Sequence, residues 1–197
     1  SCNAPTRMLV PEHRYEAVAQ LAQTTARSIK VGAPDSGADM GPIANKAQYA
    51  RVLEMIEKGL ADGAVLIAGG PGRPDGLNRG YFVQPTVFGR VTPDMAIARQ
   101  EIFGPVLSIM TYRDVEDAIA IANDSDYGLS GAVWSANRQR AYDVAARLRT
   151  GMVHINGAGL DSAAPFGGYK QSGNGREWGK YGLQEFLELK SVYGANS

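Results

Sequence analysis

The stretch "PVLSIMTYRDVEDAIAIANDSDYGLSGAVWS", residues 105–135, decides the fold class, because it contains two apolar runs separated by a helical pattern. Residues 105–112 and 128–135 are apolar and predict strands, and Asp114 is a suitable N-cap for a helix over 114–124. A helix of this length between two strands is typical of a βαβ unit. The stretch therefore predicts parallel strands joined by a helix.

The same alternation extends along the chain. Further helices are predicted over 12–29, 45–61, 95–100 and 137–151, and further strands over 64–68, 81–89, 152–156 and the tail 186–193. We expect 64–68 to be a buried strand, Pro85 to mark an edge or a bend, and the last helix to begin at Asn137 and end at Gly151. The chain is thus predicted to be an α/β protein with a mainly parallel sheet and helices on both faces.

Length and charge limit the function classes. The 197 residues suit one domain, and Lys and Arg balance Asp and Glu at 20 each. Nucleic acids and anionic membranes require a basic surface, so neither is expected as a partner. No apolar run approaches the roughly 20 residues that cross a bilayer, and no signal peptide is expected, since the first 20 residues lack an apolar segment. A single cysteine fits the reducing cytoplasm, and the first residue is Ser rather than Met, so we expect part of a longer chain.

That single cysteine is Cys2, in the opening segment "SCNAPTR". A thiol attacks carbon as the thiolate, so a lone cysteine can be a nucleophile. A lone cysteine is more often a small buried apolar residue. The residues around Cys2 leave both interpretations open.

A second candidate segment is "QEIFGPV", residues 100–106, where a carboxylate and an aromatic ring precede a Gly-Pro turn and a strand. Glu101 can accept hydrogen bonds from paired sugar hydroxyls, and Phe103 can pack against a flat ring. Loops at strand ends are where α/β sheets bind ligands. A surface Glu and a core Phe are the commoner explanation of such a turn.

The glycine-rich segment 156–182 follows the last predicted internal strand. Gly173, Gly175 and Gly179 do not have the spacing of a dinucleotide fingerprint, and no phosphate-binding P-loop is present. His13 and His154 lie far apart without Cys or acidic neighbours in a ligand pattern, so no metal site is predicted.

Taken in order, these segments resemble the NAD(P)-dependent aldehyde dehydrogenase superfamily, specifically its C-terminal catalytic domain. "SCNAPTR" resembles the family's C-x-A-x-x-R nucleophile segment, "QEIFGPVLSI" its glutamate–phenylalanine segment, and "PFGGYKQSGNGRE" its C-terminal signature. "DYGLSGAVWS" and "GMVHIN" are similar to its linking strands. The resemblance covers essentially the whole chain.

The resemblance implies that Cys2 is the catalytic nucleophile, which forms a thiohemiacetal and then a thioester with the aldehyde. It also implies a set of residues that bind NAD or NADP: Glu101 at the nicotinamide ribose, Phe103 beside the ring, Leu129 and Phe166 near the nicotinamide and substrate, and Gln48 and Arg51 near the adenosine ribose. The loop 157–164 would line the substrate entrance, where we favour a solvated Asp161.

In the family, the domain that binds most of the cofactor precedes the nucleophile, together with the general base and an oxyanion-hole asparagine. We therefore expect residues 1–182 to be the catalytic domain, 183–197 to be an oligomerisation strand, and this chain to be inactive alone. The parent would be a homodimer or homotetramer acting on an aldehyde. The alternatives are a coenzyme A-acylating relative, a non-catalytic binding or structural homologue, or a cysteine hydrolase.

Overall fold

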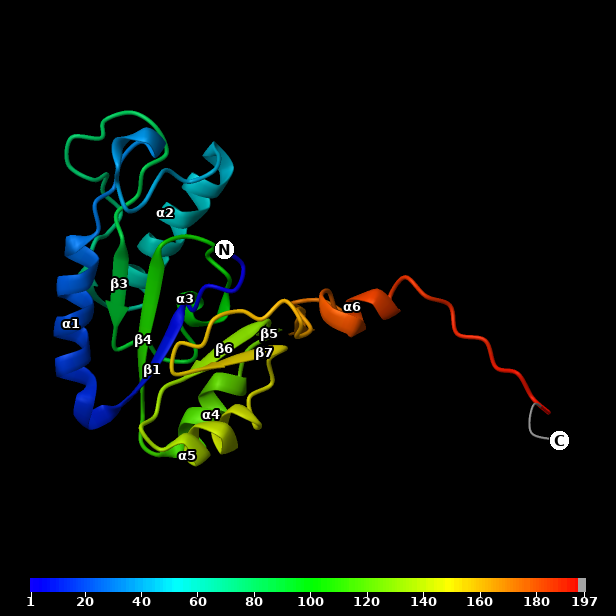
Figure 1. The fold of residues 1–197 in the computed structure, drawn as a ribbon. Helices are drawn as coiled ribbons and strands as arrows, with labels where there is room; N and C mark the ends of the chain where they lie inside the picture. Colours follow the sequence, from blue (N-terminus) through cyan, green and yellow to red (C-terminus); the bar gives the residue numbers. More distant parts are fainter. Residues whose placement is uncertain (195–197) are drawn as a thin grey trace. The chain divides into compact units, whose positions relative to one another are not determined.

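The computed structural model describes residues 1–194, and the chain divides into two compact units, Ser1–Ser125 and Asp126–Ser197 (Figure 1). The first unit contains a four-stranded sheet and the second contains two separate two-stranded sheets. Among the described residues, every strand is paired within its own unit. The division predicted from the sequence, a catalytic domain over 1–182 and a tail over 183–197, stays a prediction.

The sheet of the first unit has the strand order β1-β4-β3-β2. Its strands are β1 (Arg7–Pro11), β2 (Val65–Ala68), β3 (Thr86–Gly89) and β4 (Val106–Tyr112). β4 lies parallel to both β1 and β3, with Arg7 opposite Ser108 and Thr86 opposite Val106, whereas β2 runs antiparallel to β3. The mainly parallel sheet predicted from the sequence is confirmed.

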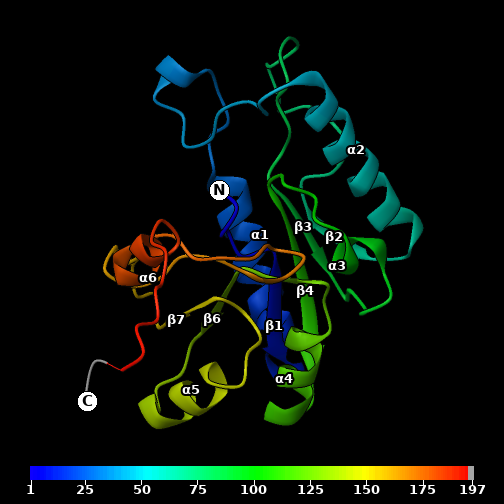
Figure 2. The same ribbon diagram turned by 90° about the vertical axis from the view of Figure 1, so that its right-hand side faces the viewer.

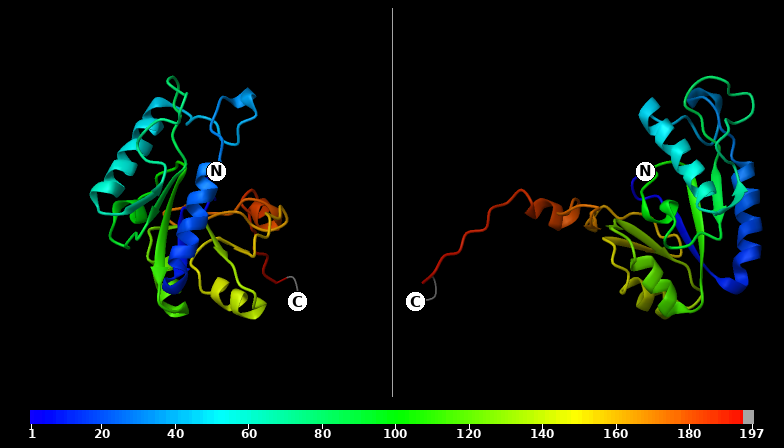
Figure 3. Two further views of the ribbon diagram at one scale, coloured as in Figure 1. Left: turned by 90° about the vertical axis from the view of Figure 1, so that its left-hand side faces the viewer. Right: turned by 180° about the vertical axis from the view of Figure 1, so that it is seen from behind.

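Helices cover both faces of this sheet (Figure 2 and Figure 3). They are α1 (Tyr15–Ser28), α2 (Lys46–Ala61), the short α3 (Ala96–Arg99) and α4 (Val115–Asn123), with 3₁₀ turns at Glu12–Arg14 and Pro34–Ser36. Tyr15 and Ala26 of α1 pack with Val10, Val87 and Ile109 on one face. The α2 and α3 helices pack on the other.

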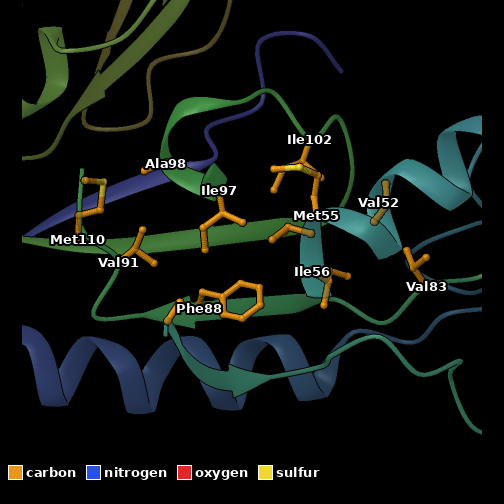
Figure 4. Packing of buried hydrophobic residues seen from close by; sticks show 12 residues of the cluster. Val52, Met55, Ile56, Val83, Phe88, Val91, Ile97, Ala98, Ile102 and Met110 are labelled. Atoms are coloured by element: carbon orange, nitrogen blue, oxygen red, sulfur yellow. The ribbon is translucent and has the colours of Figure 1, made fainter. Parts of the chain in front are cut away.

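The core beneath α2 and α3 is the larger of the two. It contains Val52, Met55 and Ile56 of α2, which are fully buried against Phe88 of β3 and Ile97 of α3 (Figure 4). A side chain of this size contributes about 1.5–3 kcal/mol when fully buried. This face therefore holds α2 firmly, and the amino end of α2 takes part in the candidate site described below.

Two strand predictions need correction. Residues 64–68 were expected to be a buried strand, but Val65 and Leu66 of β2 are exposed because β2 is an edge strand with one neighbour. Residues 81–89 were expected to be a strand with Pro85 at an edge or a bend, but β3 covers only Thr86–Gly89, begins directly after Pro85 and lies between β2 and β4, so the edge position is wrong. A proline that precedes a strand leaves every ladder N–H intact, so β3 can occupy an interior position.

The second unit contains β5 (Tyr127–Gly128), β6 (Ser130–Val133), α5 (Arg138–Ala145), β7 (Met152–Ile155), β8 (Tyr169–Lys170) and α6 (Gly179–Gln184). β6 lies parallel to β7, and β5 lies antiparallel to β8. The strand-helix-strand order β6-α5-β7 is a βαβ unit of the kind that the alternation predicted. The parallel pair predicted for residues 105–135 is wrong, because β4 belongs to the four-stranded sheet whereas β6 pairs with β7 in a separate sheet.

Two differences from the sequence predictions occur in this unit. Asn137 caps α5 as expected, but the helix ends at Ala145, six residues before Gly151. Arg147 and Leu148 donate to carbonyls only three residues back, so the chain tightens out of the α-helix there. Residues 185–194 form no strand, since no neighbouring strand is hydrogen-bonded to them in the part that the structure describes. The oligomerisation role of 183–197 stays a prediction.

Candidate active site

Cys2 is exposed and lies in a turn ahead of β1, closed by a bond from the Ala4 N–H to the Ser1 carbonyl. The chain then enters the sheet, where the Ser108 N–H of β4 donates to the Thr6 carbonyl at 2.9 Å. The thiol is therefore accessible and stands at the amino end of β1. Cys2 is therefore not the small buried apolar residue that a lone cysteine more often is.

Glu101 and Phe103 lie in the turn that connects α3 to β4. Glu101 is exposed and the Phe103 side chain is 51% exposed, whereas Ile102 between them is 5% exposed and anchors the turn in the core. Phe103 has φ 55°, in the left-handed region that a non-glycine residue seldom adopts. Such a conformation costs about 1–3 kcal/mol and is common at functional sites.

These two segments reach the same edge of the sheet. β1 and β4 are parallel neighbours, so the turn before β1 and the turn before β4 both lie at the amino ends of the strands (Figure 1). The structure thus brings Cys2, Glu101 and Phe103 to one sheet edge. It is the amino edge, whereas ligands of open α/β sheets usually bind at the carboxyl edge.

Gln48 and Arg51 lie in the first two turns of α2, and both side chains contact the turn that carries Glu101. The Gln48 Nε2 donates to the Ile102 carbonyl at 2.8 Å and to the Phe103 carbonyl at 3.0 Å. The Arg51 Nη2 donates to Gln100 Oε1 at 2.8 Å. The sequence offered no signal for these pairings, because the partners lie about fifty residues apart and two of the three acceptors are backbone carbonyls.

Arg7 is a further residue whose role the sequence left unassigned. Its guanidinium donates to the carbonyls of Ile121 and Ala122 in the last turn of α4, at 3.2 and 2.9 Å. Burial, and then the nearby positive charge of Arg99, lower the pKa of Arg7. Arg7 thus caps α4 and fixes the strand that follows the turn of Cys2.

Leu129 and Phe166, the other expected cofactor residues, lie in the second unit and are half-buried. The Phe166 ring packs against Trp178 with ring centroids 4.9 Å apart, and its backbone pairs with Glu177. In the expected entrance loop, Asp161 is exposed and accepts the Ala163 N–H at 2.9 Å. His154 forms a 2.7 Å hydrogen bond between Nδ1 and the Ala158 carbonyl, which ties β7 to that loop.

The chemistry of the amino edge suits a nucleotide and an electrophile. An exposed carboxylate such as Glu101 can accept hydrogen bonds from both hydroxyls of a ribose, and an exposed ring such as Phe103 can pack against a flat heterocycle. An accessible thiol can attack a carbonyl carbon. Within residues 1–194, no group of three or more His, Cys, Asp or Glu side chains is arranged to hold a metal ion. Nor is any helix there long and apolar enough to cross a bilayer.

The sequence model of the aldehyde dehydrogenase family matches residues 1–192. The chain therefore belongs to the aldehyde dehydrogenase family.

Several individual proteins are similar to it. A 3-succinoylsemialdehyde-pyridine dehydrogenase from Pseudomonas sp is 60% identical over 195 residues, which cover 98% of this chain and 41% of that protein. A putative aldehyde dehydrogenase from Staphylococcus saprophyticus is 48% identical with the same coverage. The chain thus spans about two fifths of the length of the relatives it matches.

Solved structures give the same result. A variant of aldehyde dehydrogenase C from Pseudomonas syringae, in complex with NAD+ and octanal, has a TM-score of 0.96 and 49% identity over 98% of this chain and 40% of that one. An aldehyde dehydrogenase from Mycobacterium tuberculosis, in complex with NAD+, has a TM-score of 0.94 and 46% identity over the same shares of the two chains. The α/β fold described above is therefore the aldehyde dehydrogenase fold.

Proposed function

We propose that this chain is the cysteine-bearing part of an enzyme that oxidises an aldehyde to a carboxylic acid with NAD or NADP. The observation that carries the proposal is the presence of the exposed Cys2 thiol and of Glu101 and Phe103 at one edge of the sheet. The matches to NAD+-bound aldehyde dehydrogenases support it, as does family membership over residues 1–192.

In this proposal, the Cys2 thiolate attacks the aldehyde carbon and forms a C–S bond, giving a thiohemiacetal. Loss of hydride from that carbon leaves a thioester on Cys2, and water then releases the carboxylic acid and restores the thiol. The backbone N–H of Cys2 would stabilise the oxyanion of the first adduct, as donors of this kind do in acyl transfer. Cys2 is exposed, so an aldehyde can reach it.

The bound nicotinamide nucleotide supplies the hydride acceptor. Glu101 would accept the hydroxyls of its nicotinamide ribose, and the Phe103 ring would lie beside the nicotinamide. Leu129 and Phe166 would contact the nicotinamide and substrate end. The resemblance implies that Gln48 and Arg51 contact the adenosine ribose. Their side chains instead form hydrogen bonds with Gln100, Ile102 and Phe103, which favours a role in holding the turn that carries Glu101.

The remaining parts of the enzyme would come from the portion of the relatives that this chain does not span. The chain covers about 41% of the Pseudomonas relative. The missing portion would supply the general base, the asparagine that completes the oxyanion hole and most of the cofactor contacts. That relative is named for a semialdehyde, which supports an aldehyde as the substrate class here.

The test is made on the full-length protein of which we propose this chain to be a part. Reduced-nicotinamide formation is measured with a panel of aldehydes, with NAD and with NADP, for the wild type, Cys2→Ala and the neighbouring control Ser1→Ala. We expect turnover by the wild type and the control, and a loss of at least about a thousandfold for Cys2→Ala. Wild-type turnover in Cys2→Ala would overturn the proposal. Turnover that requires coenzyme A would replace it with an acylating reaction.

A further inference from the structure

The amino end of α2 is built to contact one turn of the first unit. Asn45 caps the helix by accepting the Gln48 N–H at 2.9 Å, which fixes the backbone of Gln48. Four residues later, Val52 is fully buried in the core and holds the helix to the sheet. The backbone of the first turn of α2, which carries the Gln48 side chain, is therefore held in place by the cap and by the core.

The amide of Gln48 is fully engaged as a donor. Its nitrogen carries two hydrogens, and the two acceptors are the consecutive carbonyls of Ile102 and Phe103, at 2.8 and 3.0 Å. Consecutive carbonyls converge on one donor only when the backbone turns sharply, and Phe103 has φ 55° at this point. The two bonds therefore stabilise the left-handed conformation that sets the direction of the Phe103 ring.

Two further contacts fix the ends of the same turn. At its start, Arg51 Nη2 donates to Gln100 Oε1 at 2.8 Å. At its end, Gly104 lies against Val52 so closely that an added Cβ would be 2.5 Å from Val52 Cγ2. Glu101 thus lies between two fixed residues. Gln100 is hydrogen-bonded to Arg51 of α2, and Ile102 is buried in the core and bonded to Gln48 of α2.

From these contacts we propose that Gln48 is a positioning residue for the cofactor, acting through the Ile102 and Phe103 carbonyls. The proposal rests on the proposed function, in which Glu101 and Phe103 contact the nicotinamide half of the cofactor. Both amide hydrogens of Gln48 are used on the protein, so Gln48 sets the shape of the nucleotide site and does not donate to the ribose.

The test uses the full-length protein and three variants. Gln48→Leu removes both donors at similar size, and Gln48→Glu keeps the shape and the acceptor atoms but cannot donate when ionised. Gln23→Leu is the matched control, because Gln23 Nε2 donates to the Ile67 carbonyl at 2.7 Å from α1, on the opposite face of the sheet. Dissociation constants for NAD and NADP come from fluorescence titration without aldehyde, and KM and kcat come from turnover.

For both Gln48 variants we expect the dissociation constant and the KM of the cofactor to rise about tenfold, as for lost hydrogen bonds that order a binding segment. The kcat at saturating cofactor should change less than about threefold, since no bond to the reacting atoms is lost. Hydrogen exchange of the amides of residues 100–104 should also speed up. Gln23→Leu should leave all of these at wild-type values.

The outcomes separate this inference from the proposed function. Unchanged cofactor affinity in both Gln48 variants, or an equal loss in Gln23→Leu, would overturn the positioning role. Cofactor binding by the wild type without aldehyde oxidation would overturn the proposed function, while the titration still decides the role of Gln48. A wild type that binds neither NAD nor NADP would overturn both.

Discussion

Gly104 lies directly against Val52, and a Cβ atom added to Gly104 would be 2.5 Å from Val52 Cγ2. This contact lets the turn before β4 approach α2 closely enough for Gln48 to reach its carbonyls. A glycine at the next position after Phe103 is therefore required by the packing of the helix. The shape of the proposed nucleotide site depends on this close approach.

The first prediction concerns this contact. Gly104→Ala forces the turn or the helix to shift, and overpacking of this kind costs about 1–3 kcal/mol in the free energy of unfolding. Urea unfolding measures the loss, and titration with NAD should show weaker binding. Gly41→Ala is the control, because an added Cβ there meets no atom within 4 Å. Equal stability of the two variants would contradict the described packing.

The sequence predicted most of the helices correctly, because their signals are local. Asp114 and Asn137 cap α4 and α5 as expected, each by accepting an N–H three residues ahead. The exposure of Val65 and Leu66 could not be predicted, since an apolar run does not indicate whether a strand has one neighbour or two. The end of α5 was also predicted wrongly. The hydrogen bonds there change from a span of four residues to a span of three, and the alanine-rich sequence gives no sign of this change.

For the site, the sequence motifs identified Cys2, Glu101 and Phe103 as candidates, and parallel pairing of β1 with β4 brings their segments to one edge. The partners of Gln48 could not be predicted. Its two acceptors are backbone carbonyls, and every residue has such a carbonyl. Only the packing of α2 on the sheet selects the carbonyls of Ile102 and Phe103.

The second prediction concerns the dependence of stability on pH. The side chain and then the backbone N–H of Arg113 donate to the Asp117 carboxylate, and these bonds lower the pKa of Asp117. An unfolded Asp has a pKa of about 3.9. Because the folded pKa is lower, the stabilisation is fully present above about pH 4 and is lost as the pH falls through the folded pKa.

Asp117→Asn should therefore reduce stability at neutral pH, and the difference from the wild type should shrink as the pH falls below about 4. Urea unfolding at a series of pH values measures this. Arg113→Gln removes the guanidinium donors but keeps the backbone N–H that donates to Asp117, so it should flatten the acid limb less than Asp117→Asn does. An acid limb identical to that of the wild type in both variants would show that this pair contributes nothing to acid unfolding.

The third prediction is that residues 1–197 expressed alone oxidise aldehydes at least about a hundredfold more slowly than the full-length protein. Under the proposed function, the chain lacks the general base and one oxyanion donor, and each such loss costs orders of magnitude. Reduced-nicotinamide formation by the two proteins at equal thiol concentration provides the measurement. Comparable rates would mean that residues 1–197 contain the complete catalytic machinery.

The fourth prediction concerns the tail, where Phe186, Leu189 and Tyr193 are 87%, 101% and 92% exposed. Residues 185–194 form no strand, yet "EFLELKSVY" has strand composition and is paired with no other strand among the described residues. We expect the chain to self-associate through this segment as its concentration rises, which light scattering measures directly.

Leu189→Lys should reduce the association, because a charge on an edge strand opposes pairing. Leu21→Lys places the same charge on an exposed position of α1 and should leave association unchanged. A wild type that stays monomeric at high concentration, or equal effects of the two lysines, would argue that the tail has no role in assembly.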